Sequence, residues 1–345
     1  MNIRSFVTRV ALALAVGVAS WTTGSSVTSL TLAQGGKTNQ SNVSPEEQNL
    51  LKGVMTAADP AAKLKASEAL VKKYPKSAAR PQAARSVADG IAGVKDAAQK
   101  IALAQEYQGQ FKEPSEQRLI VPILIEAFAG ANRLDEAFSS GAEFLKQDPD
   151  SVTVLVQLMS LGTDQSKQKN PKFIPQSLQY GAHASELIEA DKKPADMDDA
   201  TWKDYKTVVL PSMYQSMGIM NLVKGDRAEA KARLLKAAAI SPTDPFNFLL
   251  LAGILNDEYQ EKGVHYRGMP EGAGKDAELK TVLALLDQVI DAYAHTIALS
   301  EGNERLQSMR QQYLQDLEAY YKYRHNNSTE GMQQLIEKYK APAKQ

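Results

Sequence analysis

The chain has 345 residues, 40 basic and 40 acidic side chains, and no cysteine. This balanced charge argues against a nucleic-acid-binding face, which needs a one-sided excess of Lys and Arg. The lack of cysteine excludes disulfides, thiolate metal sites, cysteine nucleophiles and a lipidated N-terminal cysteine. Strand-like alternation of Val and Ile is scarce, so the composition predicts an all-α protein.

The N-terminus has the order of a secretory signal peptide. Two arginines precede an apolar run at 10–19, which small and polar residues follow. The run is too short to cross a hydrocarbon core of roughly 30 Å, so we expect no permanent membrane anchor. Small residues up to Ala33 predict a signal peptide over 1–33, with Val18-Ala19-Ser20 as a second cleavage site. The mature protein would be periplasmic or extracellular, in a bacterium.

A polar leader at 34–44 precedes the first helix. Ser44-Pro45-Glu46-Glu47 has the residues of a capping box with proline at the first helical position, and Asp59-Pro60 and Asp244-Pro245 repeat the cap-then-proline order. The apolar spacing then predicts short helices with tight turns between them. The predicted helices cover 45–57, 60–74, 80–93, 95–111, 116–130, 134–147, 151–161, 174–190, 199–223, 227–239, 245–261, 276–299, 302–325 and 329–340.

Two segments of equal length, 118–151 and 211–244, share a common spacing. Each has a residue that tolerates a left-handed turn, then a small residue that lets two helices approach, then a proline that ends the unit. The three pairs of matching positions are Asn132 and Gly225, Ala137 and Ala230, and Pro149 and Pro242.

These motifs resemble the tetratricopeptide repeat family. The resemblance implies a right-handed superhelix of roughly seven stacked helix hairpins over 45–300, with inserts at 162–173 and 262–275 and a helical cap at 301–345. Asn221 departs from the family pattern in the second unit, and Ile125, Gly141 and Phe144 depart in the first. The positions that match are Val121, Leu124, Phe128, Ala137 and Pro149 in 118–151, and Tyr214, Met217, Gly218, Ala230, Leu234, Ala237 and Pro242 in 211–244.

In that family, the first helix of each unit lines a concave groove that holds a peptide or a partner helix. The resemblance therefore implies a partner-binding groove in the second unit and on the helix that follows it. The candidate groove residues are Gln215, Ile219, Leu222, Phe246, Leu249 and Asn256.

The insert at 262–275 contains Gly274-Lys275, the core of phosphate-binding loops. The loop pattern needs glycine where Met269 stands and Ser or Thr where Asp276 stands, and a helical run precedes it. We therefore exclude a nucleotide site here. An insert that interrupts a repeat is a natural contact point, and we select His265, Tyr266 and Arg267 at its edge as candidate partner contacts.

We predict no catalytic residue, metal or cofactor. The four histidines, His183, His265, His295 and His325, are too far apart in sequence for a helical zinc pair, and no nucleophile motif is present. A carboxylate pair from distant segments stays open as an alternative.

Two clusters of one residue type admit two interpretations. Met213, Met217 and Met220 share one helical stripe, which favours a core role over an adaptable binding surface. The C-terminal region is rich in tyrosine, which suits a cap over the last hairpin or a binding patch. Its tyrosines are Tyr313, Tyr320, Tyr321, Tyr323 and Tyr339.

The sequence thus favours an exported, non-catalytic scaffold that binds a protein or peptide in a groove. The alternative is a small-molecule or glycan binder, or an enzyme, with a pocket between the stretched repeats and the C-terminal cap. Self-association through an exposed terminal hairpin is a third hypothesis.

Overall fold

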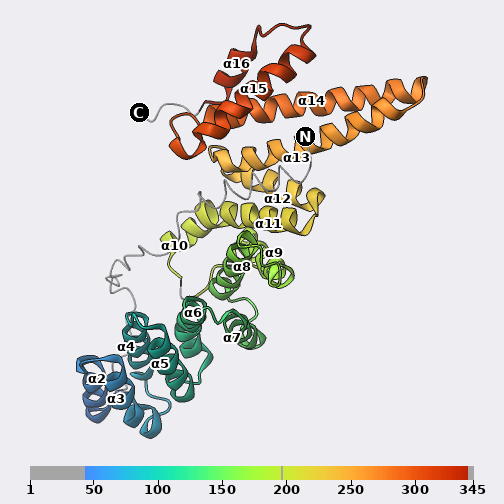
Figure 1. The fold of residues 1–345 in the computed structure, drawn as a ribbon. Coiled ribbons are helices and arrows are strands. Elements are labelled where there is room, and N and C mark those ends of the chain that lie inside the picture. The colour runs from blue at the N-terminus through green and yellow to red at the C-terminus, as the bar shows by residue number, and fades with distance from the viewer. Residues whose placement is uncertain (1–42, 196, 341–345) are drawn as a thin grey trace. The chain divides into compact units, whose positions relative to one another are not determined.

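The computed structural model describes residues 43–195 and 197–340, and this part of the chain is helical and contains no strand (Figure 1). The predicted all-α class is confirmed for it. The signal peptide and nearly all of the leader lie outside the described residues. The helices are α2 (Pro45–Thr56), α3 (Pro60–Lys73), α4 (Arg80–Ala92), α5 (Ala97–Gln110), α6 (Pro114–Gly130), α7 (Leu134–Gln147), α8 (Val152–Lys167), α9 (Ile174–Glu189), α10 (Asp199–Asp204), the π-helix η2 (Tyr205–Val209), α11 (Leu210–Lys224), α12 (Arg227–Ile240), α13 (Pro245–Gly268), α14 (Ala273–Leu299), the 3₁₀-helix η3 (Glu304–Leu306), α15 (Gln307–Arg324) and α16 (Met332–Lys338).

The described residues form two compact units. One contains 43–161 with Ala182–Pro194, and the other contains Gly162–Gly181 with Ala195 and 197–340. Within each unit, helices that follow one another in the chain pack against one another, as α2 does on α3, α6 on α7, α11 on α12 and α13 on α14. This arrangement is consistent with a helical repeat.

Polar side chains begin the helices at the predicted places. The Ser44 hydroxyl accepts from the Glu47 amide at 3.3 Å, while the Glu47 carboxylate accepts from the Ser44 amide at 2.8 Å. Asp59 and Asp244 each accept a backbone amide of the helix that they precede, at 2.8 and 2.9 Å. These bonds satisfy amides that have no partner inside the helix, so the predicted capping is confirmed.

The shared spacing of the two matching segments has the predicted structural effect. Asn132 and Gly225 adopt left-handed φ values of 57° and 88° at the turns. Ala137 and Ala230 have no exposed surface. The second helices end at Gln147 and Ile240, shortly before Pro149 and Pro242.

Glycine allows the closest helix contacts. A Cβ atom placed on Gly218 of α11 would lie 2.8 Å from Leu234 Cγ of α12, and one on Gly141 would lie 2.7 Å from Leu158 Cδ1. At Gly162 of α8, a Cβ would lie 1.8 Å from Ser177 Oγ and 2.5 Å from Ser177 Cβ of α9. At these three places, a side chain of the next helix therefore lies against the glycine main chain at a distance that leaves no room for a Cβ atom.

A buried ion pair joins α4 to α6 in the N-terminal unit. The Arg80 guanidinium donates to both carboxylate oxygens of Glu116, at 2.5 and 2.9 Å, and the Glu116 side chain is only 4 % exposed. Glu116 also accepts the Glu113 amide, and Tyr107 donates to the Glu116 carbonyl at 3.2 Å. The buried charge is thus neutralised and hydrogen-bonded, as a buried charge requires.

Both predicted inserts are shorter than the sequence indicated. Helix α8 continues to Lys167, and α13 continues through Gly268, so that only 168–173 and 269–272 connect helices. The prediction of a loop at 262–268 is wrong because no residue there stops a helix. Gly263 is buried within α13, and the break comes at Pro270 and at Gly272, whose φ is 139°.

Of the described helices, α14 is long and apolar enough to cross a membrane by length and composition. Within its most apolar stretch, 56 % of the residues are buried against other helices. A core helix of a soluble protein passes the same test.

Replacing Gly162 with alanine should destabilise the protein by about 2 kcal/mol, because the new methyl group would overlap both Ser177 side-chain atoms. Gly53→Ala is the matched control. A Cβ atom placed on Gly53 of α2 would meet no atom within 4 Å, so alanine there should stabilise the helix by up to about 1 kcal/mol. Calorimetric unfolding of both variants checks this, and a Gly162→Ala variant that unfolds like the wild type would contradict the close contact.

Candidate functional site

The candidate site lies on the pair formed by α13 and α14 and on α15, which packs against this pair. Helices α13 and α14 are longer than the helices before them, and α15 packs antiparallel on α14. The Arg310 guanidinium donates to the Ile297 carbonyl at 3.1 Å near one end of α15, and Arg324 donates to Asp287 at 2.7 and 3.2 Å near the other. Beyond this point the hairpin continues to its tip, past α15 and α16 (Figure 1). We call residues 261–286 the arm.

A chain of tyrosine rings leads from the core to the surface. Tyr313 stacks on Tyr293 with ring centroids 4.5 Å apart, Tyr293 lies 6.0 Å from Tyr320, and Tyr320 meets the edge of Tyr259 at 5.5 Å. Tyr293 and Tyr313 are buried, and burial raises the pKa of both hydroxyls far above the usual value. Among the C-terminal tyrosines, Tyr313 and Tyr321 belong to the buried core of the last hairpin, as a capping role requires.

Tyr320 fixes α15 to α13. Its hydroxyl donates to Asn256 Oδ1 at 2.8 Å and accepts from Gln260 Nε2 at 2.9 Å. Gln260 shares one helical stripe with Val264 and Arg267, and Tyr323 lies one turn beyond Tyr320 on α15. The exposed and half-buried side chains at this junction form what we call the tyrosine face. Its residues are Tyr259, Gln260, Val264, Arg267, Tyr320 and Tyr323.

The tyrosine face contains the two most exposed large hydrophobic side chains of the described chain. Val264 is 62 % exposed and Tyr323 is 65 % exposed. Tyr259 and Tyr320 are half-buried beside them. Large apolar side chains that gather at one place on a surface are typical of an interaction site.

The three candidate contacts at the edge of the predicted insert all lie on α13. His265 Nδ1 lies 3.1 Å from Glu278 Oε1 of α14, which Lys262 also contacts at 3.1 Å. The Lys275 ammonium lies over the Tyr266 ring, 5.4 Å from the ring centroid. His265 and Tyr266 therefore hold the arm together.

Arg267 differs from these two residues. It is exposed, and no acidic side chain of the described residues pairs with it. Three other arginines of the same unit do have such partners: Arg227 binds Glu261, Arg233 binds Glu229 and Arg324 binds Asp287.

The predicted groove residues have mostly internal contacts. Ile219 is 6 % exposed in a core cluster with Leu234 and Leu250, and Leu249 is 1 % exposed in the cluster of the last hairpin. These two side chains are core residues and are not accessible to a partner in this structure. Leu222 and Phe246 pack on the same clusters and are partly exposed.

The two polar groove candidates serve as links between helices. Gln215 Nε2 donates to Asp244 Oδ2 and to Asn247 Oδ1, both at 2.9 Å, and so joins α11 to the start of α13. Asn256 accepts the Tyr320 hydroxyl. The methionine stripe, Met213, Met217 and Met220, is fully buried, which confirms its core role.

His295 lies in an aromatic sandwich. Its ring stacks between Phe248 of α13, 3.5 Å away, and Tyr339 after α16, 4.1 Å away. Burial lowers the pKa of His295. Asp291 acts in the opposite direction and Lys338 in the same direction. The neutral imidazole is therefore the form that the folded state favours.

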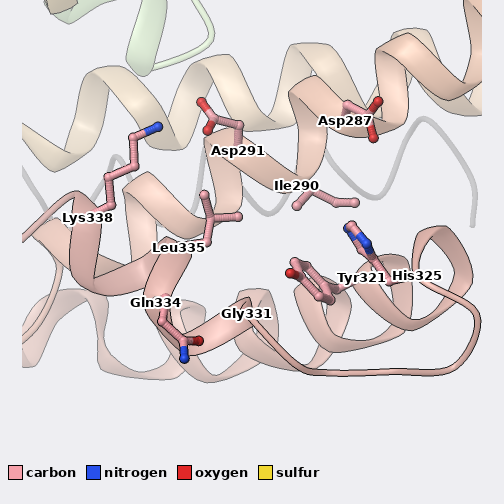
Figure 2. A pocket seen from close by; sticks show the side chains of 9 residues that line it. All are labelled: Asp287, Ile290, Asp291, Tyr321, His325, Gly331, Gln334, Leu335 and Lys338. Atoms are coloured by element: carbon pink, nitrogen blue, oxygen red, sulfur yellow. The ribbon is translucent and has the colours of Figure 1, made fainter.

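A solvent-open depression of about 470 Å³ lies between α14, α15 and α16, as Figure 2 shows. Ile290 and Leu335 contribute apolar side chains to its lining, and His325 stacks on Tyr321 at 4.1 Å along one side. Its two carboxylates are already bound, Asp287 to Arg324 and Asp291 to the Tyr339 hydroxyl.

A second open depression, of about 580 Å³, lies between α13 and α14 on the arm. Ala284 and Leu285 line its apolar part. The acids on its rim are paired as well, Glu258 with Lys231 and Glu261 with Arg227. The described residues contain no group of three or more His, Cys, Asp or Glu side chains that could hold a metal ion.

The sequence interpretation missed Tyr259, Gln260 and Val264. The signal was present, because positions 260, 264 and 267 recur at helical spacing. A loop at 262–275 would give these positions no common face, whereas the continuation of α13 through Gly268 places them on one helical stripe.

Neither a scan against protein-family models nor a search of curated proteins finds a match to this chain.

His295 predicts a specific pH dependence of stability. The unfolded chain binds a proton on this histidine near pH 6.5, whereas the folded protein resists protonation until lower pH. The free energy of unfolding should therefore fall as the pH drops from 7.5 to about 5.5. The His295→Phe variant keeps an aromatic ring in the stack and should lose this part of the dependence. Urea unfolding of both proteins at both pH values checks this. An equal loss of unfolding free energy in the wild type and the variant would contradict it.

Proposed function

We propose that this chain is an exported, non-catalytic helical scaffold that binds a protein or peptide partner. The observation that carries the proposal is the tyrosine face, where Val264 and Tyr323 are exposed beside Tyr259 and Tyr320. Tyrosine and arginine are enriched at protein interfaces, because they combine a large contact area with a polar end. The helix pairs behind the face hold its backbone in place.

The finer architecture belongs to the same proposal. Stacked pairs of this kind suit a tetratricopeptide-like superhelix, and the spacing at 118–151 and 211–244 supports it. Of the six groove positions, Gln215, Leu222, Phe246 and Asn256 are partly exposed, and the side chains of Gln215 and Asn256 already form hydrogen bonds between helices. The tyrosine face is therefore the better-supported contact surface, and the groove is a secondary one.

Export rests on the sequence alone. The charged, then apolar, then small-residue order of 1–33 supports secretion to the periplasm or beyond.

The depression between α14, α15 and α16 supports a different function, a binder of small molecules or glycans. Its volume of about 470 Å³ lies within the usual range of ligand pockets, and the Tyr321 and His325 rings line one wall. Its carboxylates already have partners in Arg324 and Tyr339, so they offer little to a polar ligand without rearrangement.

Affinity capture after crosslinking in intact cells tests the scaffold function. Mass spectrometry should find a protein enriched with the full chain over an unrelated exported control. The double variant Val264→Ser and Tyr323→Ser should lose most of that enrichment, because it removes the exposed apolar area. Met55→Ser is the matched control, since Met55 is an exposed apolar residue of α2 in the other unit. No enrichment with the wild type would contradict the proposed function.

A further inference from the structure

The arginine of the tyrosine face is held in place by its own helix. Gly263 lies one turn before Arg267 and is buried although it has no side chain. A Cβ atom at this position would lie 3.5 Å from Arg267 Nη1. The guanidinium of the exposed Arg267 thus lies beside the main chain at Gly263, and this contact limits its conformational freedom before any partner binds.

The Arg267 guanidinium places a positive charge near Tyr259. Burial raises the pKa of the Tyr259 hydroxyl, Tyr323 raises it further, and Arg267 lowers it. Arg267 and Tyr323 are therefore both within electrostatic range of Tyr259. Val264 lies between Gln260 and Arg267 along the exposed stripe of α13.

These residues combine an unpaired cation with an adjoining apolar and aromatic surface. A guanidinium binds a carboxylate by two parallel hydrogen bonds, and such charge-assisted bonds are the stronger class. The Asp316 carboxylate lies one turn before Tyr320, at the opposite end of the face from the arm. A bound segment therefore meets the positive charge of Arg267 at the arm end and the negative charge of Asp316 at the other end.

We propose that the tyrosine face binds a protein segment that carries an acidic side chain beside an apolar one. The carboxylate binds Arg267, and the apolar side chain packs on Val264, Tyr259 and Tyr323. This inference rests on the proposed scaffold function and names the chemistry of its partner.

Two fluorescein-labelled peptides test the proposal by fluorescence polarisation with the full mature chain. Both have a Leu-Phe core, preceded by two glutamates in one peptide and by two lysines in the other. The glutamate peptide should bind about tenfold more tightly than the lysine peptide, and added salt should reduce the difference. Arg267→Gln should remove most of this preference, because it deletes the charge and keeps a polar side chain.

Arg305→Gln is the matched control. Arg305 is another exposed arginine of the same unit without an acidic partner among the described residues, and it lies in η3 at the opposite end of α14 from the arm tip. This variant should bind like the wild type. Three results would overturn the proposal: equal binding of both peptides, no binding of either, or an Arg267→Gln variant that keeps the preference. If the cellular partner is still captured with Arg267→Gln, the scaffold function stands and only the acidic partner is rejected.

Discussion

The structure depends on how closely two antiparallel helices can approach. At Gly162, Gly141 and Gly218, a single added carbon would overlap the neighbouring helix, and at Ala137 and Ala230 the methyl group is completely buried. These small residues let a side chain of the neighbouring helix lie directly against the main chain, and the side chains around the contact fill the core. Each helix pair then presents a fixed surface to the next pair. Polar caps and left-handed turns at Asn132 and Gly225 set where one helix stops and the next begins.

The last pair departs from this pattern by its length, and the candidate site results from that departure. Helices α13 and α14 continue beyond α15, so the arm has a neighbour on fewer sides. Val264 and Tyr323 stay exposed at the place where α15 ends. The buried Tyr293–Tyr313 stack and the Tyr320 hydrogen bonds keep this surface rigid. A rigid apolar surface loses little conformational entropy when a partner binds.

The sequence was sufficient for local features and insufficient for contacts between distant segments. Ser44, Asp59 and Asp244 act through neighbouring residues, so their caps were predictable. The core position of Ile219 was not predictable in this way, because its burial depends on how α12 and α13 pack around α11. Gly141 looked like a departure from the repeat pattern, but it makes room for Leu158 of the next helix. The predicted insert at 262–275 includes Gly263, whereas in the structure Gly263 belongs to α13 and lies beside the Arg267 side chain. The tyrosine face depends on both kinds of information, since it joins residues from α13 and α15.

Site-specific photo-crosslinking in intact cells directly measures whether the tyrosine face contacts a partner protein. A photoreactive residue at position 264 of the full chain places the crosslinker in the tyrosine face, and one at position 53 places it on an exposed surface of α2 in the other unit. We expect an adduct with one partner protein from position 264 that is absent from position 53. The partner's crosslinked segment should contain an acidic residue. No adduct from position 264, or the same adducts from both positions, would contradict the claim that this face binds the partner.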